Sequence, residues 1–199
     1  MTYHDYIKSL KNRGYKYFGE GAYAHVYGKE KSNRVVKVGH SIDGWVLFAY
    51  ILLNNKRLAK SDIFPKIYSL KIFTNGHSER EIWWYVAEIE RLDRTIRDVE
   101  DQYQEHNEDL YNFYDQVKYR SYWNQRKLRK YYSKADKCTK KSIDSLLKLK
   151  TLSQKYKPSW DLHDGNWMIR KNGTLVLTDP FEIATIPKLN KYIVKKRAA

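Results

Sequence analysis

The chain has 199 residues, of which 42% are hydrophobic, enough for one globular domain or two small lobes with a real core. Its 38 Lys and Arg against 23 Asp and Glu give a formal charge of +15, which predicts attraction to nucleotide phosphates, nucleic acid or acidic protein surfaces. The single cysteine excludes a disulfide framework within the chain, and the longest apolar run, 45–53, is too short to span a bilayer. We therefore expect a soluble cytoplasmic protein with no membrane contact.

The first part of the chain, residues 15–88, is predicted to be mostly β-structure. The strand candidates are 15–18, 25–27, 34–38, 67–73 and 82–87. Between the third and fourth of them, the apolar segment 45–54 has the length of a buried helix rather than of a strand.

The middle of the chain differs in kind, because 91–157 is rich in charge and tyrosine and contains neither glycine nor proline. Apolar residues at helical spacing in 110–117 and 143–152 predict two or three long helices there. Residues 158–181 return to short strands, with a hairpin of 167–169 and 174–177 around the turn Lys171-Asn172-Gly173.

A glycine-containing turn joins the first two strand candidates. It reads Gly19-Glu20-Gly21-Ala22-Tyr23-Ala24-His25-Val26-Tyr27. Glycines in such a hairpin let backbone N–H groups approach phosphate oxygens without side chains in the way. The spacing is that of the kinase pattern G-x-G-x-x-G-x-V, with Ala24 at the third glycine. Taken alone, the segment is a weak signal, and an ordinary β-turn is the favoured alternative.

The next strand candidate carries Lys37 inside the apolar run Val35-Val36-Lys37-Val38. A lysine in such a run is costly unless its amine has a partner. In kinases the corresponding lysine meets the α- and β-phosphates of ATP. An edge-strand lysine facing water is the alternative, but the distance from the glycine turn favours the functional interpretation.

The most specific spacing lies in 161–181. A kinase catalytic loop needs an Asp that accepts or orients the acceptor proton, an Asn five residues later that holds a metal, and a second Asp beyond a hairpin that holds Mg²⁺. Asp161, Asn166 and Asp179 meet all three requirements. The alternative is a loop of turn-forming residues followed by a hairpin with an unrelated Asp.

His163 lies two residues after Asp161. A contact with the transferred phosphate or ordering of the loop is its functional interpretation, and packing of the loop is the equally weighted alternative. A zinc site formed with Asp161 and Asp164 lacks further ligands at usable spacing.

Together these segments resemble the protein-kinase-like superfamily, and more closely the early serine/threonine protein kinases of T-odd bacteriophages. The resemblance rests on the glycine turn, the run 34–39, the loop 160–168 and Thr178-Asp179-Pro180, and it extends from about residue 14 to 181. It implies an α+β, minimal bilobal protein-kinase-like fold. Residues 1–90 would form an N-terminal lobe with an antiparallel sheet, residues 91–199 a truncated helical C-terminal lobe, and 88–90 the hinge.

The resemblance also implies a site for ATP and Mg²⁺, with Mn²⁺ as a substitute metal. The catalytic candidates are Asp161, as base, and His163. The metal ligands would be Asn166 and Asp179. The ATP-binding candidates are Gly19, Glu20, Gly21, Ala22, Tyr23, Val26, Lys37, Glu88 and Glu90, the last two through backbone groups at the adenine edge.

The sequence departs from the kinase pattern at two informative places. Kinases pair the strand lysine with a glutamate on the following helix, but Asp43 is the only acid between Lys37 and Asp62. No Ala-Pro-Glu follows Asp179, so the usual activation segment and peptide-binding helices cannot fit. The first departure leaves the partner of Lys37 open, and the second leaves substrate recognition to other parts, such as the helices of 91–157.

The function implied is an ATP-dependent protein kinase that transfers the γ-phosphoryl group to Ser or Thr of host proteins during phage takeover, in the host cytoplasm. The basic surface would suit acidic or nucleic-acid-associated host proteins as substrates. The alternatives are a pseudokinase-type protein that binds and inhibits a host factor, and a small-molecule kinase of the aminoglycoside or choline type. Direct nucleic-acid binding through the aromatic and basic stretch 119–132 is less favoured than a helix with one packed aromatic face.

Overall fold

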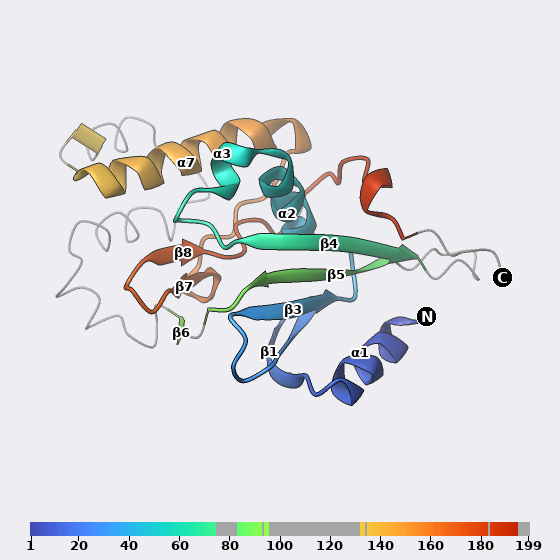
Figure 1. The fold of residues 1–199 in the computed structure, drawn as a ribbon. Helices are drawn as coiled ribbons and strands as arrows, with labels where there is room; N and C mark the ends of the chain where they lie inside the picture. Colours follow the sequence, from blue (N-terminus) through green and yellow to red (C-terminus); the bar gives the residue numbers. More distant parts are fainter. Residues whose placement is uncertain (75–82, 93, 96–131, 134, 183, 195–199) are drawn as a thin grey trace.

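The computed structural model describes residues 1–74, 83–92, 94–95, 132–133, 135–182 and 184–194. The fold is mixed α+β, as predicted, and is built on a five-stranded antiparallel sheet with the order β1-β2-β3-β5-β4 (Figure 1). Its strands are β1 (Lys16–Gly21), β2 (Ala24–Gly28), β3 (Arg34–Gly39), β4 (Ile67–Thr74) and β5 (Trp83–Glu90). All five coincide with the strands expected from the sequence, and β1 and β5 each continue about three residues further than expected.

Helix α1 (Tyr3–Asn12), which the sequence analysis did not predict, covers one face of this sheet. Thr2 and Asp5 form a capping box, in which each side chain bonds the other residue's backbone N–H. The apolar side of α1, with Leu10 fully buried, packs on a cluster that includes Val38 and Trp84. The helix therefore seals the face of the sheet that points away from the rest of the chain.

The opposite face is covered by α2 (Gly44–Asn54), α3 (Lys56–Ala59) and α7 (Lys137–Ser153), as Figure 1 shows. Almost every residue of α2 is buried, which explains its continuous apolar sequence: the sheet contacts one side and α7 another. The helical spacing seen in 143–152 is confirmed by α7, whose buried residues include Ile143, Leu146 and Leu149. The expected helices of 96–131 lie outside the described residues.

A second, three-stranded sheet carries the loop that was expected to be catalytic. It has the order β6-β7-β8, and its strands are β6 (Arg94–Thr95), β7 (Trp167–Ile169) and β8 (Leu175–Leu177). Strands β7 and β8 form the predicted hairpin. One hydrophobic core holds residues from α2, β4 and β5 together with residues from α7, β7 and β8, so packing is continuous across the proposed lobe boundary at residue 90.

Three short 3₁₀ turns complete the described structure. They are η2 (Gln154–Tyr156), η3 (Asp164–Asn166) and η4 (Asn190–Tyr192). Just after η4, Ile193 forms a parallel bridge with Ile72, and Val194 N–H donates to the Ile72 carbonyl at 2.8 Å, so the end of the described chain lies along the outer edge of β4. Among the described helices, none combines the length and the apolar character that crossing a membrane would require.

The two sheets are joined by an ion pair between Glu90, the last residue of β5, and Arg170, directly after β7. Arg170 donates from Nε and Nη2 to the two carboxylate oxygens at 2.7 and 2.8 Å, and both side chains are only 15% exposed. Its guanidinium also bonds the carbonyls of Asp62 and Phe64. Burial raises the pKa of Glu90, but Arg170 and the Lys66 N–H outweigh it, so the pKa is lowered overall and the carboxylate stays ionised.

Replacing Arg170 by Ala should therefore destabilise the fold strongly, because Glu90 and two carbonyls lose their partner in a poorly solvated place. We expect a loss of about 3 kcal/mol in the free energy of unfolding, measured by urea denaturation. The matched control is Lys171→Ala, which removes the same charge from an exposed neighbour in the same hairpin. Equal stability of the two variants would contradict a structural role for the ion pair.

Candidate functional site

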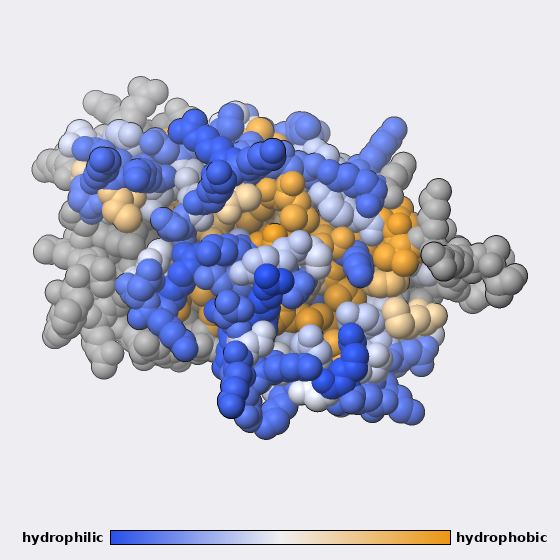
Figure 2. Space-filling model, viewed as in Figure 1, coloured by the Kyte–Doolittle hydropathy of each residue, from blue (hydrophilic) through white to orange (hydrophobic). Residues whose placement is uncertain are grey.

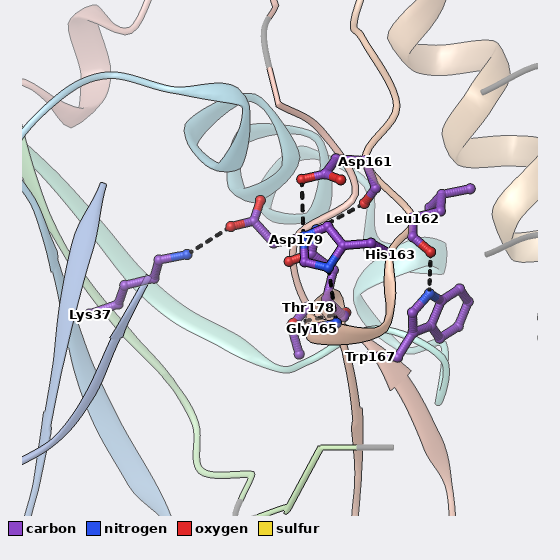
Figure 3. A network of polar contacts seen from close by, with 9 residues as sticks. Lys37, Asp161, Leu162, His163, Gly165, Trp167, Thr178 and Asp179 are labelled. Carbon is purple, nitrogen blue, oxygen red and sulfur yellow. Dashed lines mark hydrogen bonds and ion pairs between the residues drawn. The ribbon is translucent and has the colours of Figure 1, made fainter. Parts of the chain in front are cut away.

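The loop 161–167 is held against the segment 178–181 by hydrogen bonds, and Figure 3 draws the loop beside Thr178 and Asp179 of that segment. Asp161 N–H donates to the Pro180 carbonyl at 2.9 Å, and both the N–H and the hydroxyl of Thr178 donate to the Asn166 carbonyl at 2.8 and 3.0 Å. Farther out, Trp160 and Phe181 form an antiparallel bridge. These bonds place the segment that carries Asp161 and Asn166 directly beside the segment that carries Asp179.

Asn166 has a defined orientation within this loop. Its Nδ2 donates to the Asp161 carbonyl at 2.9 Å, which leaves Oδ1 as the amide atom available to an outside cation. The following residue, Trp167, is fully buried and donates from Nε1 to the Leu162 carbonyl at 3.2 Å. The buried Trp167 and the Asn166 amide therefore each fix the loop by a hydrogen bond to one of its own carbonyl groups.

His163 orders the loop and faces the proposed base. Its Nδ1 accepts from Gly165 N–H at 3.0 Å, so the ring proton of the neutral imidazole belongs on Nε2. Nε2 lies 3.5 Å from Oδ2 of Asp161. The ring is 59% exposed and the Asp161 side chain 35%, so both can meet a molecule from solvent.

Lys37 reaches from β3 to this loop region, where its Nζ lies 3.2 Å from Oδ2 of Asp179, a residue 142 positions away (Figure 3). The lysine side chain is only 14% exposed. Its ammonium also lies 4.5 Å from the ring centroid of Trp45, on α2. A carboxylate and an aromatic face therefore stabilise this largely buried cation.

The start of α2 brings a second carboxylate into this neighbourhood. Asp43 caps the helix by accepting from Val46 N–H at 3.3 Å. A Cβ at Gly44 would lie 2.2 Å from the Phe181 carbonyl oxygen, so glycine allows the first turn of α2 to approach the chain just after Asp179. Burial raises the pKa of Asp43 to about 6; Lys37 lowers it and Asp179 raises it.

The pKa of Asp179 is raised as well. Burial is the main cause, and the charge of Asp161 adds to it, while Lys37 and His163 act in the opposite direction. Asp43 and Asp179 therefore both interact with the Lys37 ammonium, and Asp161 interacts with Asp179. Carboxylates thus outnumber positive charges here. A surplus of negative charge is what a binding site for a cation requires.

Tyr85 forms the inner wall of the cluster. Its ring stacks on Trp45 with centroids 5.2 Å apart, and its hydroxyl is buried without a hydrogen bond to any described residue. Burial, with the nearby charges of Asp43 and Asp179, raises the pKa of this hydroxyl well above its ordinary value. The phenol thus stays neutral beside the carboxylates.

Strand register decides which predicted ATP-binding residues face Lys37. Val26 pairs directly with Lys37, Gly19 with Val26, and Gly21 with Ala24, so all of these belong to the same face of the sheet. Built Cβ atoms at Gly19 and Gly21 would meet nothing within 4 Å. Packing within the described protein therefore does not require glycine at either place, and the space above them on the Lys37 face is open.

The tip of the β1–β2 hairpin is formed by Ala22 and Tyr23, and it is anchored because His40 N–H donates to the Tyr23 carbonyl at 3.0 Å. Glu20 behaves differently from the glycines beside it. Its carboxylate lies 3.1 Å from Nε2 of His25, on the face covered by α1. Only the backbone of Glu20 could take part in binding on the Lys37 face.

Glu88 and Glu90, expected at the adenine edge, have their side chains engaged elsewhere. The Glu88 carboxylate accepts from Arg34 at 3.1 Å, and Glu90 is held by Arg170. Glu90 N–H donates to the Lys66 carbonyl at 2.8 Å, so this backbone donor is already used. An adenine contact at Glu90 N–H would require that bond to break.

The candidate metal ligands fit a magnesium ion better than a zinc ion. Asp179 and Asn166 offer oxygen atoms from two adjacent segments, and Mg²⁺ is commonly held by one or two carboxylates while water and phosphate fill the remaining positions. Among the described residues, no group of three His, Cys, Asp or Glu side chains could hold a metal by itself.

The structure brings five of the predicted residues into one network. They are Lys37, Asp161, His163, Asn166 and Asp179. The sequence analysis named Asp43 only as the one acid between Lys37 and Asp62, and it missed the contributions of Trp45 and Tyr85. An Asp-Gly pair before an apolar helix is a recognisable capping signal. No protein-family model matches the chain, and no curated protein matches it well enough to count as a relative. Inference about function therefore rests on this geometry and on the sequence motifs.

The raised pKa of Asp43 predicts a particular dependence of stability on pH. Between its ordinary value of 3.8 and about 6, the folded state retains a proton that the unfolded chain releases, so this residue's contribution to stability falls as pH rises through that window. Asp43→Asn keeps an acceptor for Val46 N–H and cannot ionise. The variant should match wild type near pH 4 and exceed it by roughly 2–3 kcal/mol at pH 7.

Urea denaturation at several pH values between 4 and 7 would measure this difference. Glu182→Gln, on an exposed side chain, is the control and should show no comparable trend. A difference between Asp43→Asn and wild type that is the same at every pH would contradict a buried, ionising Asp43.

Proposed function

We propose that the chain is an ATP-dependent phosphotransferase, and specifically a protein kinase that transfers the γ-phosphoryl group to serine or threonine. The observation that carries the proposal is the contact of Lys37 with Asp179, made next to a loop with Asp161 and Asn166 at kinase spacing. The strand order β1-β2-β3-β5-β4, with a helix between β3 and β4, supports it. The choice of Ser and Thr in host proteins rests on the resemblance to phage kinases.

In this proposal Asp161 receives the proton of the acceptor hydroxyl. The acceptor oxygen forms a bond to the γ-phosphorus, the bond from that phosphorus to the leaving oxygen breaks, and ADP departs. The exposed edge of Asp161 and its contact with Nε2 of His163 suit this role, because the imidazole can orient the carboxylate.

Lys37 and the glycine turn would hold the phosphates of ATP. Lys37 is kept in the binding face by Asp179 and Trp45, so the ammonium is in position without a glutamate from α2. Asn166 Oδ1 and the Asp179 carboxylate would hold Mg²⁺, or Mn²⁺, which when bound neutralises charge on the β- and γ-phosphates. The excess of carboxylates around Lys37 is consistent with that need.

The first test is transfer of labelled phosphate from Mg-ATP by the purified protein, alone and in bacterial lysate. Asp161→Ala and Asp179→Asn should each lower the rate by at least about 10²-fold, since one loses the proton acceptor and the other a metal ligand. Glu182→Gln makes a similar charge change close to Asp179 on an exposed side chain, and should retain wild-type activity.

The outcomes separate the competing functions. Labelled protein bands that vanish with both variants support the kinase. Binding of Mg-ATP without any transfer would contradict it and favour a pseudokinase-type inhibitor of a host factor. Transfer to an aminoglycoside or choline, with no labelled protein, would instead indicate a small-molecule kinase.

The open space above Gly21 gives a second prediction. Gly21→Val places a side chain where no described atom lies within 4 Å of the new Cβ, so stability should change by less than about 0.5 kcal/mol. The side chain would intrude on the face that bears Lys37, and KM for ATP should rise by about ten-fold. Gly21→Ala, with a smaller side chain, should fall between. Unchanged kinetics in both variants would argue that phosphates do not approach this turn.

A further inference from the structure

A second concave site lies between α3 and the first half of α7, separate from the cluster around Lys37. The cavity has a volume of about 600 Å³. Its lining is drawn from both helices and from the residues that follow α3: Arg57, Leu58, Lys60, Ser61, Asp62, Lys137, Cys138, Lys141, Ser142, Asp144, Ser145 and Lys148. Ser61 Oγ donates to Ser145 Oγ at 2.7 Å, which joins its two walls.

The lining has a marked excess of positive charge. Five of its residues are cationic and two are acidic; the cations are Arg57, Lys60, Lys137, Lys141 and Lys148. All five are exposed, and none of them forms an ion pair with another described residue. Figure 2 shows hydrophilic residues gathered over α7 and α3, along the top of the molecule. Like charges held this close repel one another unless an anionic partner is present.

We propose that this cavity is a docking site for an acidic segment of a partner protein. Five cations drawn from two elements complement carboxylates spaced along a peptide, while the serine hydroxyls can bond its backbone. The two acidic residues of the lining, Asp62 and Asp144, are outnumbered by the five cations and can accept from peptide N–H groups.

Two further observations favour a peptide over nucleic acid. None of the residues lining the cavity is aromatic, so the site lacks the stacking surfaces on which single-stranded nucleic acids depend. A hollow of this volume suits a few side chains rather than a duplex, whose phosphates are read along an extended surface.

The cavity is connected to the candidate catalytic segments through the chain after α3. Asp62, part of the lining, accepts from Arg170 through its carbonyl, and the next residue, Ile63, accepts from Leu177 N–H at 2.8 Å. Leu177 lies two residues before Asp179. A partner bound here would therefore contact the segment after α3, which is hydrogen-bonded to β8. The docking itself does not depend on the proposed kinase activity.

Fluorescence anisotropy of a short labelled peptide of alternating Glu and Ser tests the proposal directly, without ATP. A Gln-Ser peptide should not bind. The double variant Arg57→Glu, Lys141→Glu, with one change in each wall, should weaken binding by about ten-fold or more. The matched control, Lys8→Glu with Lys31→Glu, changes the net charge equally on exposed lysines elsewhere and should bind nearly as wild type.

Each other result would overturn the proposal. Equal weakening in both double variants would mean that only overall charge matters. Tighter binding of a single-stranded RNA oligonucleotide, lost in Arg57→Glu, Lys141→Glu but retained in the control, would assign the cavity to nucleic acid. Circular dichroism and thermal unfolding of both variants confirm that the compared proteins are folded, and Lys141→Glu alone provides a milder change should the double variant unfold.

Discussion

The contact between Lys37 and Asp179 is the constraint on which the arrangement of the site depends. It joins the third strand of the large sheet to the chain leaving the small sheet, across 142 positions of sequence. An ammonium that is mostly buried needs a partner, and here a carboxylate and the ring of Trp45 share that task. The close approach of Gly44 to Phe181 makes this sharing possible, because it brings the start of α2 beside Asp179.

Carboxylates outnumber the ammonium group at the site: Asp43 and Asp179 both interact with Lys37, and Asp161 interacts with Asp179. Burial is the main cause that raises the pKa of Asp43 and of Asp179, and a neighbouring carboxylate adds to it in each case. A bound divalent cation would lower both pKa values. By contrast, Glu90 has a complete set of partners in Arg170 and Lys66, and its pKa is lowered. The charges of Asp43 and Asp179 could be compensated by a bound ligand, whereas the charge of Glu90 is already compensated within the fold by Arg170.

Local patterns in the sequence predicted the strands, α2 and the β7–β8 hairpin, because each depends on neighbours within a few residues. Helix α1 was missed, since its tyrosines obscured the apolar spacing of Ile7 and Leu10. The contact of Trp45 with Lys37 could not be predicted, because Trp45 belongs to an apolar run whose pattern indicates only a buried helix. The pairing of Glu90 with Arg170 joins residues 80 positions apart, and no local pattern marks such a contact.

The bridge between Ile72 and Ile193 has a consequence for the newly synthesised chain. Strand β4 is the outer strand of the sheet, and its free edge can pair with another chain until something covers it. All five strands of the large sheet are synthesised before residue 100, whereas Ile193 and Val194, which lie along β4, follow much later. Until Ile193 is synthesised, the edge of β4 lacks this partner, which makes pairing with another chain a hazard during translation.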